Sequence, residues 1–546
     1  MNQGKFKGIT TLACTHMVFS PFLSNQKFNM RFHRTPLQIQ KQKTIEWLTD
    51  PKSQEAIPSD LGITTEHMAT LENTIQGRIV WPWTPGYDND KREFNDVYPA
   101  DPVMIVYVAN YEDVRLVLEF ATETDLPTTI RSGGHSLADY SVCDGIVIDI
   151  SGLKSVSVDT VNQTVWVEAG NTFADLNPKL EFYGMHLPGG GCPSVSVAGY
   201  MQGGGYGITS RNFGIQSDIV LAFTMMLADG SLVVASATQN TDLFWAVRGG
   251  TGGNFGVLLN ITYRIFPLGL IWGLQLAWDF ETDATNAANA LVAIQDNYLS
   301  GFNYPRLGIE TLVYTDITTD NHKKVVFAAA FIGTEAELDA AIAPLMALPG
   351  TIVKLKKQGK YSDVNNWVLE GIPDVPHDVK FYGRSAYVAR SLTAADYANI
   401  LNQFKTAPNN YAMLDLEGYG GMINQYPVQS SAFIHRDVIF DFYTILFFDN
   451  ASNDQEQNRE WMISFYAFLE QYTNSHSYQN YPNRDQTNFQ WAYWGSYYNQ
   501  LVSIKQKYDP KNFFHYPQSI GAPIAAEYED KQIMLFDNTP IVYETH

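Results

Sequence analysis

Apolar residues in the first half of the chain alternate between short runs and helical spacing. Residues 104–108 form an apolar run of the length expected for a buried strand. Asn110 follows as a candidate helix cap, and Leu126-Pro127 interrupts the helical pattern that comes after it. The apolar residues of that pattern are Val114, Val117, Leu118 and Ala121. The sequence therefore predicts a strand, a helix and a second strand that ends near residue 131.

The same alternation continues to about residue 267. Thr172 and Asp175 mark the start of a short helix that Gly184 can close. Four further segments have strand patterns: residues 145–150, 164–168, 219–227 and 257–265. Together these elements predict one domain.

Between about residues 268 and 472 the pattern changes, and long strands alternate with helices. Strands are predicted at 325–332 and 439–448, and Thr334 with Glu337 forms a capping box that opens a helix. A later helix carries an aromatic stripe at helical spacing: Trp461, Phe465, Phe468 and Tyr472. Because such stripes are more often core than ligand contacts, we predict a sheet covered by helices.

The two ends of the chain differ in pattern. Residues 497–508 predict an amphipathic helix that Asp509-Pro510 stops. Residues up to about 63 are polar and irregular apart from a helical patch at 38–48, and the first thirty only weakly resemble a signal peptide. We interpret this part as a leader, and the sequence leaves its cleavage open. No run approaches the roughly 20 apolar residues that a membrane-spanning helix needs.

Composition narrows the class of protein. A chain of 546 residues is long enough for two domains. The net charge of -21 and the pI near 4.9 oppose nucleic-acid binding, which requires a basic face. Three cysteines, Cys14, Cys143 and Cys192, are too few for a disulfide framework. We expect no nucleic-acid partner and no metal site, and the localisation stays open between secreted and cytoplasmic.

Three glycine-rich turns carry the candidate chemistry: residues 131–136, 189–195 and 203–207. Backbone N–H groups in such turns form anion-binding nests, so the first turn could hold a diphosphate with added charge from Arg131. None of the turns is a Walker loop, and none gives a G-x-G-x-x-G fingerprint between a strand and a helix. A Rossmann dinucleotide site is therefore not predicted.

The sequence R-S-G-G-H-S at 131–136, followed by G-G-G-C-P-S-V at 189–195, resembles the berberine-bridge-enzyme-like flavoprotein oxidases of the vanillyl-alcohol-oxidase superfamily. Residues 248–256 and 501–520 also resemble that family, and residues 432–436 do so more weakly. The resemblance implies an α+β, two-domain flavoprotein. A PCMH-type FAD-binding domain would adjoin an α+β substrate domain whose antiparallel sheet is covered by helices.

The implied organisation assigns every part of the chain. Its ranges are a leader or N-terminal extension (1–63), the FAD-binding domain (64–267), the substrate-binding domain (268–476), a C-terminal return to the FAD domain (477–530) and a tail (531–546).

The resemblance also implies how FAD is held. His135 resembles the histidine bonded to the 8α-methyl group of the flavin, and Cys192 resembles the thiol bonded to ring carbon 6, so FAD would be attached twice. Val195 resembles the oxidase type of the family, in which a small side chain leaves dioxygen a path to the ring. Further residues implied to bind the cofactor are Arg131, Ser132, Gly133, Gly134, Ser136, Gly199, Gly203, Gly204 and Asn254.

Three tyrosines are the candidate catalytic residues. The segment Y-Q-N-Y-P at 478–482 resembles the family motif Y-x-N-Y, whose second tyrosine serves as the base in several members. That tyrosine corresponds to Tyr481, and Tyr478 is the alternative. Tyr206 corresponds to a second active-site tyrosine of some family oxidases, although it can equally be a packing aromatic.

The implied function is an FAD-dependent oxidase. It would take a hydride from an alcohol, a lactol or a secondary-metabolite hydroxyl and reduce dioxygen to hydrogen peroxide. Two alternatives stay open: an oxidative cyclase of natural-product biosynthesis, and a catalytically idle binding protein with the flavin fold. The expected partners are dioxygen and a small molecule such as a sugar or secondary metabolite, and the sequence leaves the substrate and the oligomeric state open.

Overall fold

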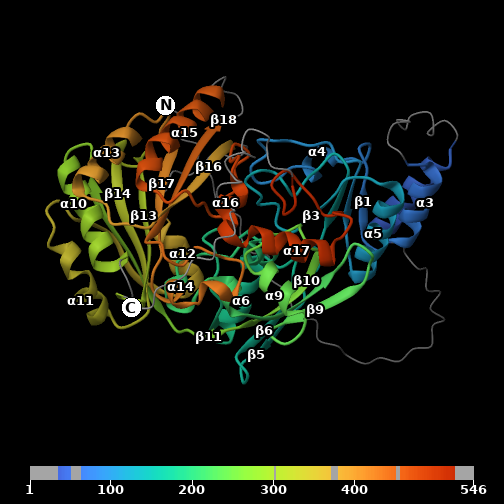
Figure 1. Cartoon of the computed structure of the whole chain (residues 1–546), viewed down its shortest axis with the longest axis horizontal. Helices are drawn as coiled ribbons and strands as arrows, with labels where there is room; N and C mark the ends of the chain where they lie inside the picture. The colour runs from blue at the N-terminus through green and yellow to red at the C-terminus, as the bar shows by residue number, and fades with distance from the viewer. Residues whose placement is uncertain (1–34, 51–62, 300–302, 370–378, 450–454, 523–546) are drawn as a thin grey trace, which may run out of the picture.

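The computed structural model describes residues 35–50, 63–299, 303–369, 379–449 and 455–522. The predicted tail and most of the predicted leader lie outside these residues. The described chain has the predicted α+β architecture, with a mixed sheet and an antiparallel sheet in its first half and a larger antiparallel sheet in its second half (Figure 1). The domain boundaries given above stay predictions.

The first half opens with a four-stranded sheet in the order β1-β2-β4-β3. Its strands are β1 (Arg78–Val80), β2 (Met104–Tyr107), β3 (Thr128–Arg131) and β4 (Ile146–Asp149). Strands β2 and β3 both run parallel to β4, and α5 (Tyr111–Thr124) connects them. The Asn110 side chain accepts a hydrogen bond from the Asp113 N–H, so the predicted cap and the strand-helix-strand unit are confirmed.

A five-stranded antiparallel sheet in the order β5-β6-β10-β8-β9 completes this half. Its strands are β5 (Val156–Asp159), β6 (Thr164–Glu168), β8 (Val220–Met226), β9 (Leu232–Ser236) and β10 (Val257–Arg264). The capping box of Thr172 and Asp175 opens α6 (Phe173–Phe182), as predicted, and Gly184 follows that helix with a φ of 66°. Two short strands, β7 (Met185–His186) and β11 (Phe266–Pro267), pair with each other.

The second half is built on a seven-stranded antiparallel sheet in the order β15-β12-β14-β13-β17-β18-β16. Its strands are β12 (Ile271–Asp279), β13 (Leu307–Asp316), β14 (His322–Phe331), β15 (Ile352–Gly359), β16 (Val379–Val388), β17 (Ala412–Gly418) and β18 (Phe440–Asp449). Helices cover one face of this sheet (Figure 1): α10 (Ala284–Ile294), α11 (Glu335–Met346), α13 (Ala394–Phe404) and α15 (Gln455–Leu469). The predicted sheet covered by helices is confirmed.

The aromatic stripe belongs to the core between this sheet and its helices. Phe465 and Tyr472 are buried there, and Trp461 and Phe468 pack against the same core. Helix α15 ends before Tyr472, which lies in a short 3-10 turn after it. The stripe therefore serves packing, as its interpretation required.

The C-terminal segment returns to the first half of the fold. Helix α17 (Tyr498–Tyr508) confirms the predicted amphipathic helix, and it lies beside α9 (Thr241–Val247) in Figure 1. Buried Leu501 belongs to the core of the first half. The ammonium group of Lys505 contacts the Asp509 carboxylate and the Asn254 carbonyl oxygen, each at 2.6 Å. These contacts hold the segment that follows the seven-stranded sheet against the first half.

The described part of the predicted leader is not separate from the domain. Helix α1 (Pro36–Leu48) buries Leu48 in the core of the first half, and Lys41 donates to the Ile75 carbonyl oxygen at 2.5 Å. These residues are therefore a packed N-terminal extension of the fold, and the first thirty residues, which the sequence predicts as a leader, lie outside the described residues.

The remaining α-helices are short or peripheral: α3 (Thr65–Thr74), α4 (Tyr87–Asp90), α7 (Val197–Gln202), α8 (Ser210–Phe213), α12 (Tyr361–Val368), α14 (Met422–Gln425) and α16 (Phe489–Trp494). In the part of the chain that the structure describes, no helix combines the length and apolar character needed to cross a bilayer.

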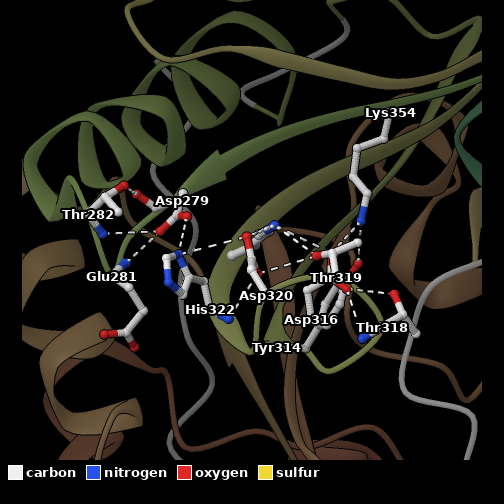
Figure 2. Close-up of polar contacts among 11 residues, drawn as sticks. Asp279, Glu281, Thr282, Tyr314, Asp316, Thr318, Thr319, Asp320, His322 and Lys354 are labelled. Atoms are coloured by element: carbon white, nitrogen blue, oxygen red, sulfur yellow. Dashed lines mark hydrogen bonds and ion pairs between the residues drawn. The ribbon is translucent and has the colours of Figure 1, made fainter.

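A network of ion pairs joins the ends of β12, β13 and β14 (Figure 2). The His322 Nδ1 lies 2.7 Å from an Asp279 carboxylate oxygen and 3.8 Å from one of Asp320. Lys324 contacts the other side of this network through Asp320, at 2.9 Å. The hydrogen bond to Asp279 raises the pKa of His322 above its ordinary value.

We predict that His322→Gln destabilises the protein more at pH 5.5 than at pH 8.5. A pKa raised by folding contributes stability that is fully present below the unfolded pKa, about 6.5, and is lost as the pH rises through the folded pKa. Thermal unfolding at both pH values measures this difference. His67→Gln is the control, because His67 forms no ion pair with any described residue. Equal destabilisation by His322→Gln at both pH values would contradict the prediction.

Candidate active site

A cavity of about 460 Å³ lies between the glycine-rich turns of the first half and one face of the seven-stranded sheet. Eleven of the residues predicted from the sequence line it: Ser132, Gly133, Gly134, His135, Ser136, Cys192, Val195, Gly199, Tyr206, Tyr478 and Tyr481. The structure thus brings three separate segments together around one space.

Four predicted cofactor residues do not line this cavity: Arg131, Gly203, Gly204 and Asn254. The Asn254 side chain accepts from the Ile520 N–H at 2.8 Å and donates to the Gly250 carbonyl oxygen at 3.0 Å, so it ties the C-terminal return to the first half. A Cβ on Gly203 would meet the side chain of Asn480, and one on Gly204 would meet Phe433. Gly203 and Gly204 thus lie against neighbouring side chains, outside the lining of the cavity.

Arg131 requires a correction. The sequence interpretation gave its charge to a diphosphate, whereas its guanidinium is buried in an ion pair with Asp149 at 2.6 Å. The same group donates to the Asp90 carbonyl oxygen at 2.8 Å and the Tyr107 hydroxyl at 3.2 Å. Parallel pairing places Arg131 of β3 opposite Asp149 of β4, so the arginine forms its ion pair within the sheet.

His135 and Cys192 lie beside each other at one wall of the cavity. The Ser194 Oγ is 2.9 Å from the His135 Nε2 and 3.3 Å from the Cys192 Sγ. The Phe94 ring stacks on the imidazole with a centroid distance of 4.4 Å. Burial lowers the pKa of His135 to about 4, so the imidazole is neutral at physiological pH and keeps a nitrogen lone pair.

The first two turns touch through their backbones. A Cβ on Gly133 would lie 2.8 Å from the Ser196 backbone nitrogen, so the close approach requires glycine there. The Ser132 and Ser196 hydroxyls lie 2.6 Å apart, and both contact the Ala169 carbonyl oxygen at 2.9 Å. This packing fixes the two candidate anchors relative to each other.

Tyr481 lines the same cavity as His135 and Cys192. Its hydroxyl donates to the Glu417 Oε1 at 2.5 Å. Its ring stacks on Tyr443 with a centroid distance of 3.7 Å and an interplanar angle of 9°. Burial and the adjacent Glu417 carboxyl raise the pKa of Tyr481 well above its ordinary value, so the phenol is protonated at rest.

The other two predicted tyrosines have different surroundings. The Tyr478 hydroxyl accepts hydrogen bonds from the Gly205 and Tyr206 backbone N–H groups at 2.8 and 3.1 Å, which orients the third glycine turn. The Tyr206 hydroxyl lies 3.2 Å from the carbonyl oxygens of Ile309 and Gly418, while its ring lines the cavity. Both hydroxyls are engaged with the backbone, unlike that of Tyr481.

Four buried carboxyl groups stand on the same side of the sheet as the cavity: Glu310, Asp415, Glu417 and Asp441. Strand register places Glu310 opposite Glu417 and Glu417 opposite Asp441. Burial, followed by the neighbouring charges of Asp415 and Asp441, raises the pKa of Glu417 well above its usual range. Glu310 and Glu417 line the cavity directly.

Sequence reasoning missed these acids, although one signal was present. Asp415 and Glu417 are spaced by two within the otherwise apolar strand β17, so both point to one face. Acidic residues inside a buried strand indicate a special site. Glu310 and Asp441 gave less warning, because only the strand order brings them beside Glu417.

The lining residues fit FAD. Nine glycines let backbone approach a flat ring system closely: Gly133, Gly134, Gly190, Gly191, Gly199, Gly207, Gly252, Gly253 and Gly256. The Tyr140 hydroxyl is buried at this cavity without a hydrogen-bond partner among the described residues, so a polar ligand group would satisfy it. Fold and site therefore define a two-domain flavoprotein.

Comparisons with known proteins agree with this class. Residues 102–236 match the family model "FAD binding domain", and residues 477–521 match "Berberine and berberine like". The chain is 29% identical to YvdP of Bacillus subtilis, named an uncharacterized FAD-linked oxidoreductase, over 82% of this chain and 98% of that protein. It is 24% identical to the xylooligosaccharide oxidase of Thermothelomyces thermophilus, over 89% of this chain and 99% of that protein.

Solved structures show the same fold. Chitooligosaccharide oxidase matches with a TM-score of 0.75 at 24% identity, over 84% of this chain and 100% of that chain. BBE-like 1 of Physcomitrella patens also gives 0.75 at 24% identity, over 84% of this chain and 99% of that one. The chain is thus an FAD-linked oxidoreductase that is similar to berberine-bridge-enzyme-like proteins, and its cofactor is FAD.

Proposed function

We propose that the protein is an oxidase that carries FAD bonded to both His135 and Cys192 and removes a hydride from a substrate hydroxyl carbon. Dioxygen would take the electrons and leave as hydrogen peroxide. The observation that carries this proposal is the hydrogen bond from the Tyr481 hydroxyl to the Glu417 carboxylate. These two side chains can act together as a proton acceptor, and both line the cavity that His135 and Cys192 also line. Relatives named xylooligosaccharide oxidase and monolignol oxidoreductase support a hydroxyl-bearing substrate.

Tyr481 and Glu417 act as one base in this proposal. Bound FAD supplies the hydride acceptor. Because the Tyr481 hydroxyl donates to Glu417, its oxygen lone pairs are free to accept the substrate hydroxyl proton while its own proton moves to the carboxylate. The raised pKa of Glu417 makes it a stronger proton acceptor than an ordinary glutamate. Tyr443 holds the phenol in place by stacking.

The charge of the cavity narrows the substrate class. Glu310 and Glu417 line it, whereas none of the described lining residues is a lysine or arginine. An anionic substrate would find no cationic side chain among the described lining residues to compensate its charge in a buried site, which is unfavourable by several kcal/mol. A neutral sugar, lactol or aromatic alcohol fits, and phenyl and phenol rings of Phe94, Phe381 and Tyr443 supply stacking surfaces.

We predict that flavin stays with the polypeptide after acid denaturation. His135→Ala and Cys192→Ala should each retain flavin through the other bond, and the double variant should release it. Flavin fluorescence of the denatured chain on a gel, with intact-protein mass, measures the attachment. Complete release of flavin from the unmutated denatured chain would contradict double attachment.

We predict that Tyr481→Phe lowers the rate of flavin reduction by roughly 10² to 10⁴, the usual contribution of a positioned acid–base group. Stopped-flow absorbance on a panel of neutral sugars and aromatic alcohols gives this rate, and flavin content should not change. Glu417→Gln should lower the rate similarly. Tyr443→Phe is the matched control, because it keeps the stacked ring and should have a smaller effect. A normal rate in Tyr481→Phe with a collapse in Tyr478→Phe would assign the base to Tyr478.

The pH dependence tests the same pair. Reduction requires ionised Glu417, so the rate should rise with pH through the raised pKa of this carboxyl and then level off. Asp415→Asn removes a neighbouring negative charge, which lowers the pKa of Glu417 and should shift the rising limb to lower pH. An unshifted rising limb in this variant would show that Glu417 is not the group whose ionisation sets the rate.

We predict that turnover produces hydrogen peroxide and that Val195→Leu slows reoxidation of the reduced enzyme while sparing reduction. Val195 lines the cavity next to the anchors, and a larger side chain there narrows the approach of dioxygen. Stopped-flow reoxidation in aerated buffer measures the effect. Reoxidation of the native enzyme by quinones or dyes alone would make it a dehydrogenase. Product mass distinguishes simple loss of two hydrogens from oxidative cyclisation.

A further inference from the structure

We propose that the Ser194 hydroxyl positions His135 and Cys192 for attachment of FAD and carries a proton between them. Ser194 is a positioning residue in this role, since it acts through the two anchors. The inference rests on the proposed double attachment.

The contacts of Ser194 connect the two anchors through one oxygen. Its Oγ lies 2.9 Å from the His135 Nε2 and 3.3 Å from the Cys192 Sγ. A serine hydroxyl offers one donor and two acceptor sites, so it can accept from the thiol and donate to the imidazole at the same time. This arrangement is a path for the thiol proton to the Nε2 of His135.

The path has a chemical use, because the thiolate is the nucleophilic form of cysteine. The Nε2 lone pair of His135 can take the proton only in passing, because burial lowers the pKa of the imidazole and disfavours its charged form, so the proton leaves again with the others in the attachment step. Each attachment breaks a flavin C–H bond and an S–H or N–H bond, and forms a C–S or C–N bond. The two electrons and two protons released in each case pass to dioxygen, which becomes hydrogen peroxide.

The backbone around Ser194 is held firmly, so its hydroxyl has a defined place. The Ala174 N–H donates to the Pro193 carbonyl oxygen at 2.8 Å, and the Phe173 N–H donates to that of Val195 at 3.1 Å. Both donors belong to the first turn of α6. The Val195 N–H also donates to the Cys192 carbonyl oxygen at 3.3 Å, which closes a turn around Pro193 and Ser194.

His135 is held from its other side. Phe94 stacks on its ring at 4.4 Å, and the Phe94 N–H donates to the Gly134 carbonyl oxygen at 2.8 Å. The imidazole is therefore clamped between an aromatic ring and the Ser194 hydroxyl. Loss of that hydroxyl would remove one side of this clamp and, among the described residues, the one side-chain hydroxyl that contacts both His135 and Cys192.

The experiment compares Ser194→Val with Ser194→Thr, two side chains of nearly equal size of which only threonine retains a hydroxyl. The full chain is purified from flavin-limited cells, mixed with FAD in aerated buffer and quenched with acid at intervals. Intact mass gives the covalent fraction, and peptide mapping separates the bond to His135 from that to Cys192. We expect attachment at Cys192 to slow at least about tenfold in the Val variant at pH 7, and the Thr variant to remain near the unmutated rate.

The pH dependence distinguishes a proton path from a merely structural role. Without the hydroxyl, the thiol must lose its proton to solvent, so attachment in the Val variant should recover as the pH is raised, because only the thiolate is nucleophilic. Equal rates in the Val variant and the unmutated chain, or a Thr variant as slow as the Val variant, would overturn the proposal. A slow Val variant with no recovery at high pH would also overturn it.

Two controls separate this proposal from others. If the unmutated chain forms no covalent bond, double attachment itself fails, whereas an unmutated chain attached at both residues with a fast Val variant removes only the role of Ser194. Circular dichroism reports whether the Val variant is folded, and Ser194→Ala replaces it if it is not. Ser503→Ala, which removes an exposed hydroxyl of α17 that donates to the Asn499 carbonyl oxygen rather than to an anchor, should not slow attachment at Cys192 tenfold.

Discussion

The segment from Tyr478 to Tyr481 links the two halves of the site, and the geometry of the cavity depends on it. The Tyr478 hydroxyl accepts hydrogen bonds from backbone N–H groups of the third glycine turn. The Asn480 side chain donates to the Tyr200 carbonyl oxygen, and the Tyr481 hydroxyl donates to Glu417 of the seven-stranded sheet. This short segment thus contacts both the glycine turns and the seven-stranded sheet that carries the buried carboxyl groups. The cavity needs this C-terminal segment, because it joins the glycine turns of the first half to the buried carboxyl groups of the second half.

Burying the carboxyl groups of the seven-stranded sheet lowers the free energy of unfolding, and this loss of stability bears on their role. Three carboxyl groups face one another across β13, β17 and β18, where burial disfavours their ionised forms. Two hydroxyl groups offset part of the cost: Ser385 donates to Asp441, and Tyr481 donates to Glu417. A fold optimised only for stability would place apolar residues here. The retained acids therefore indicate chemistry, since perturbed carboxyl groups in a cavity are typical of acid–base sites.

Local motifs predicted the secondary structure around the glycine turns well, because the contacts of caps and turns are set by neighbouring residues. The glycine turns, the caps at Asn110 and Thr172 and the helix that ends at Tyr508 all follow from short-range pattern. Arg131 shows the limit of such reasoning. Its charge suggested a phosphate ligand, but the parallel register of β3 and β4 sets Asp149 beside it, and that register is not readable from a single strand.

The acidic side escaped prediction for a related reason. Glu310, Glu417 and Asp441 are far apart in sequence and meet only because β17 lies between β13 and β18. Strand order in an antiparallel sheet depends on packing of the whole domain, so no local pattern fixes it. The cavity thus combines glycine turns set by local motifs with buried carboxyl groups assembled from several strands. Because these two groups of residues come from different segments, substitutions on the strands can change the acidic side of the cavity while the glycine turns keep their conformation.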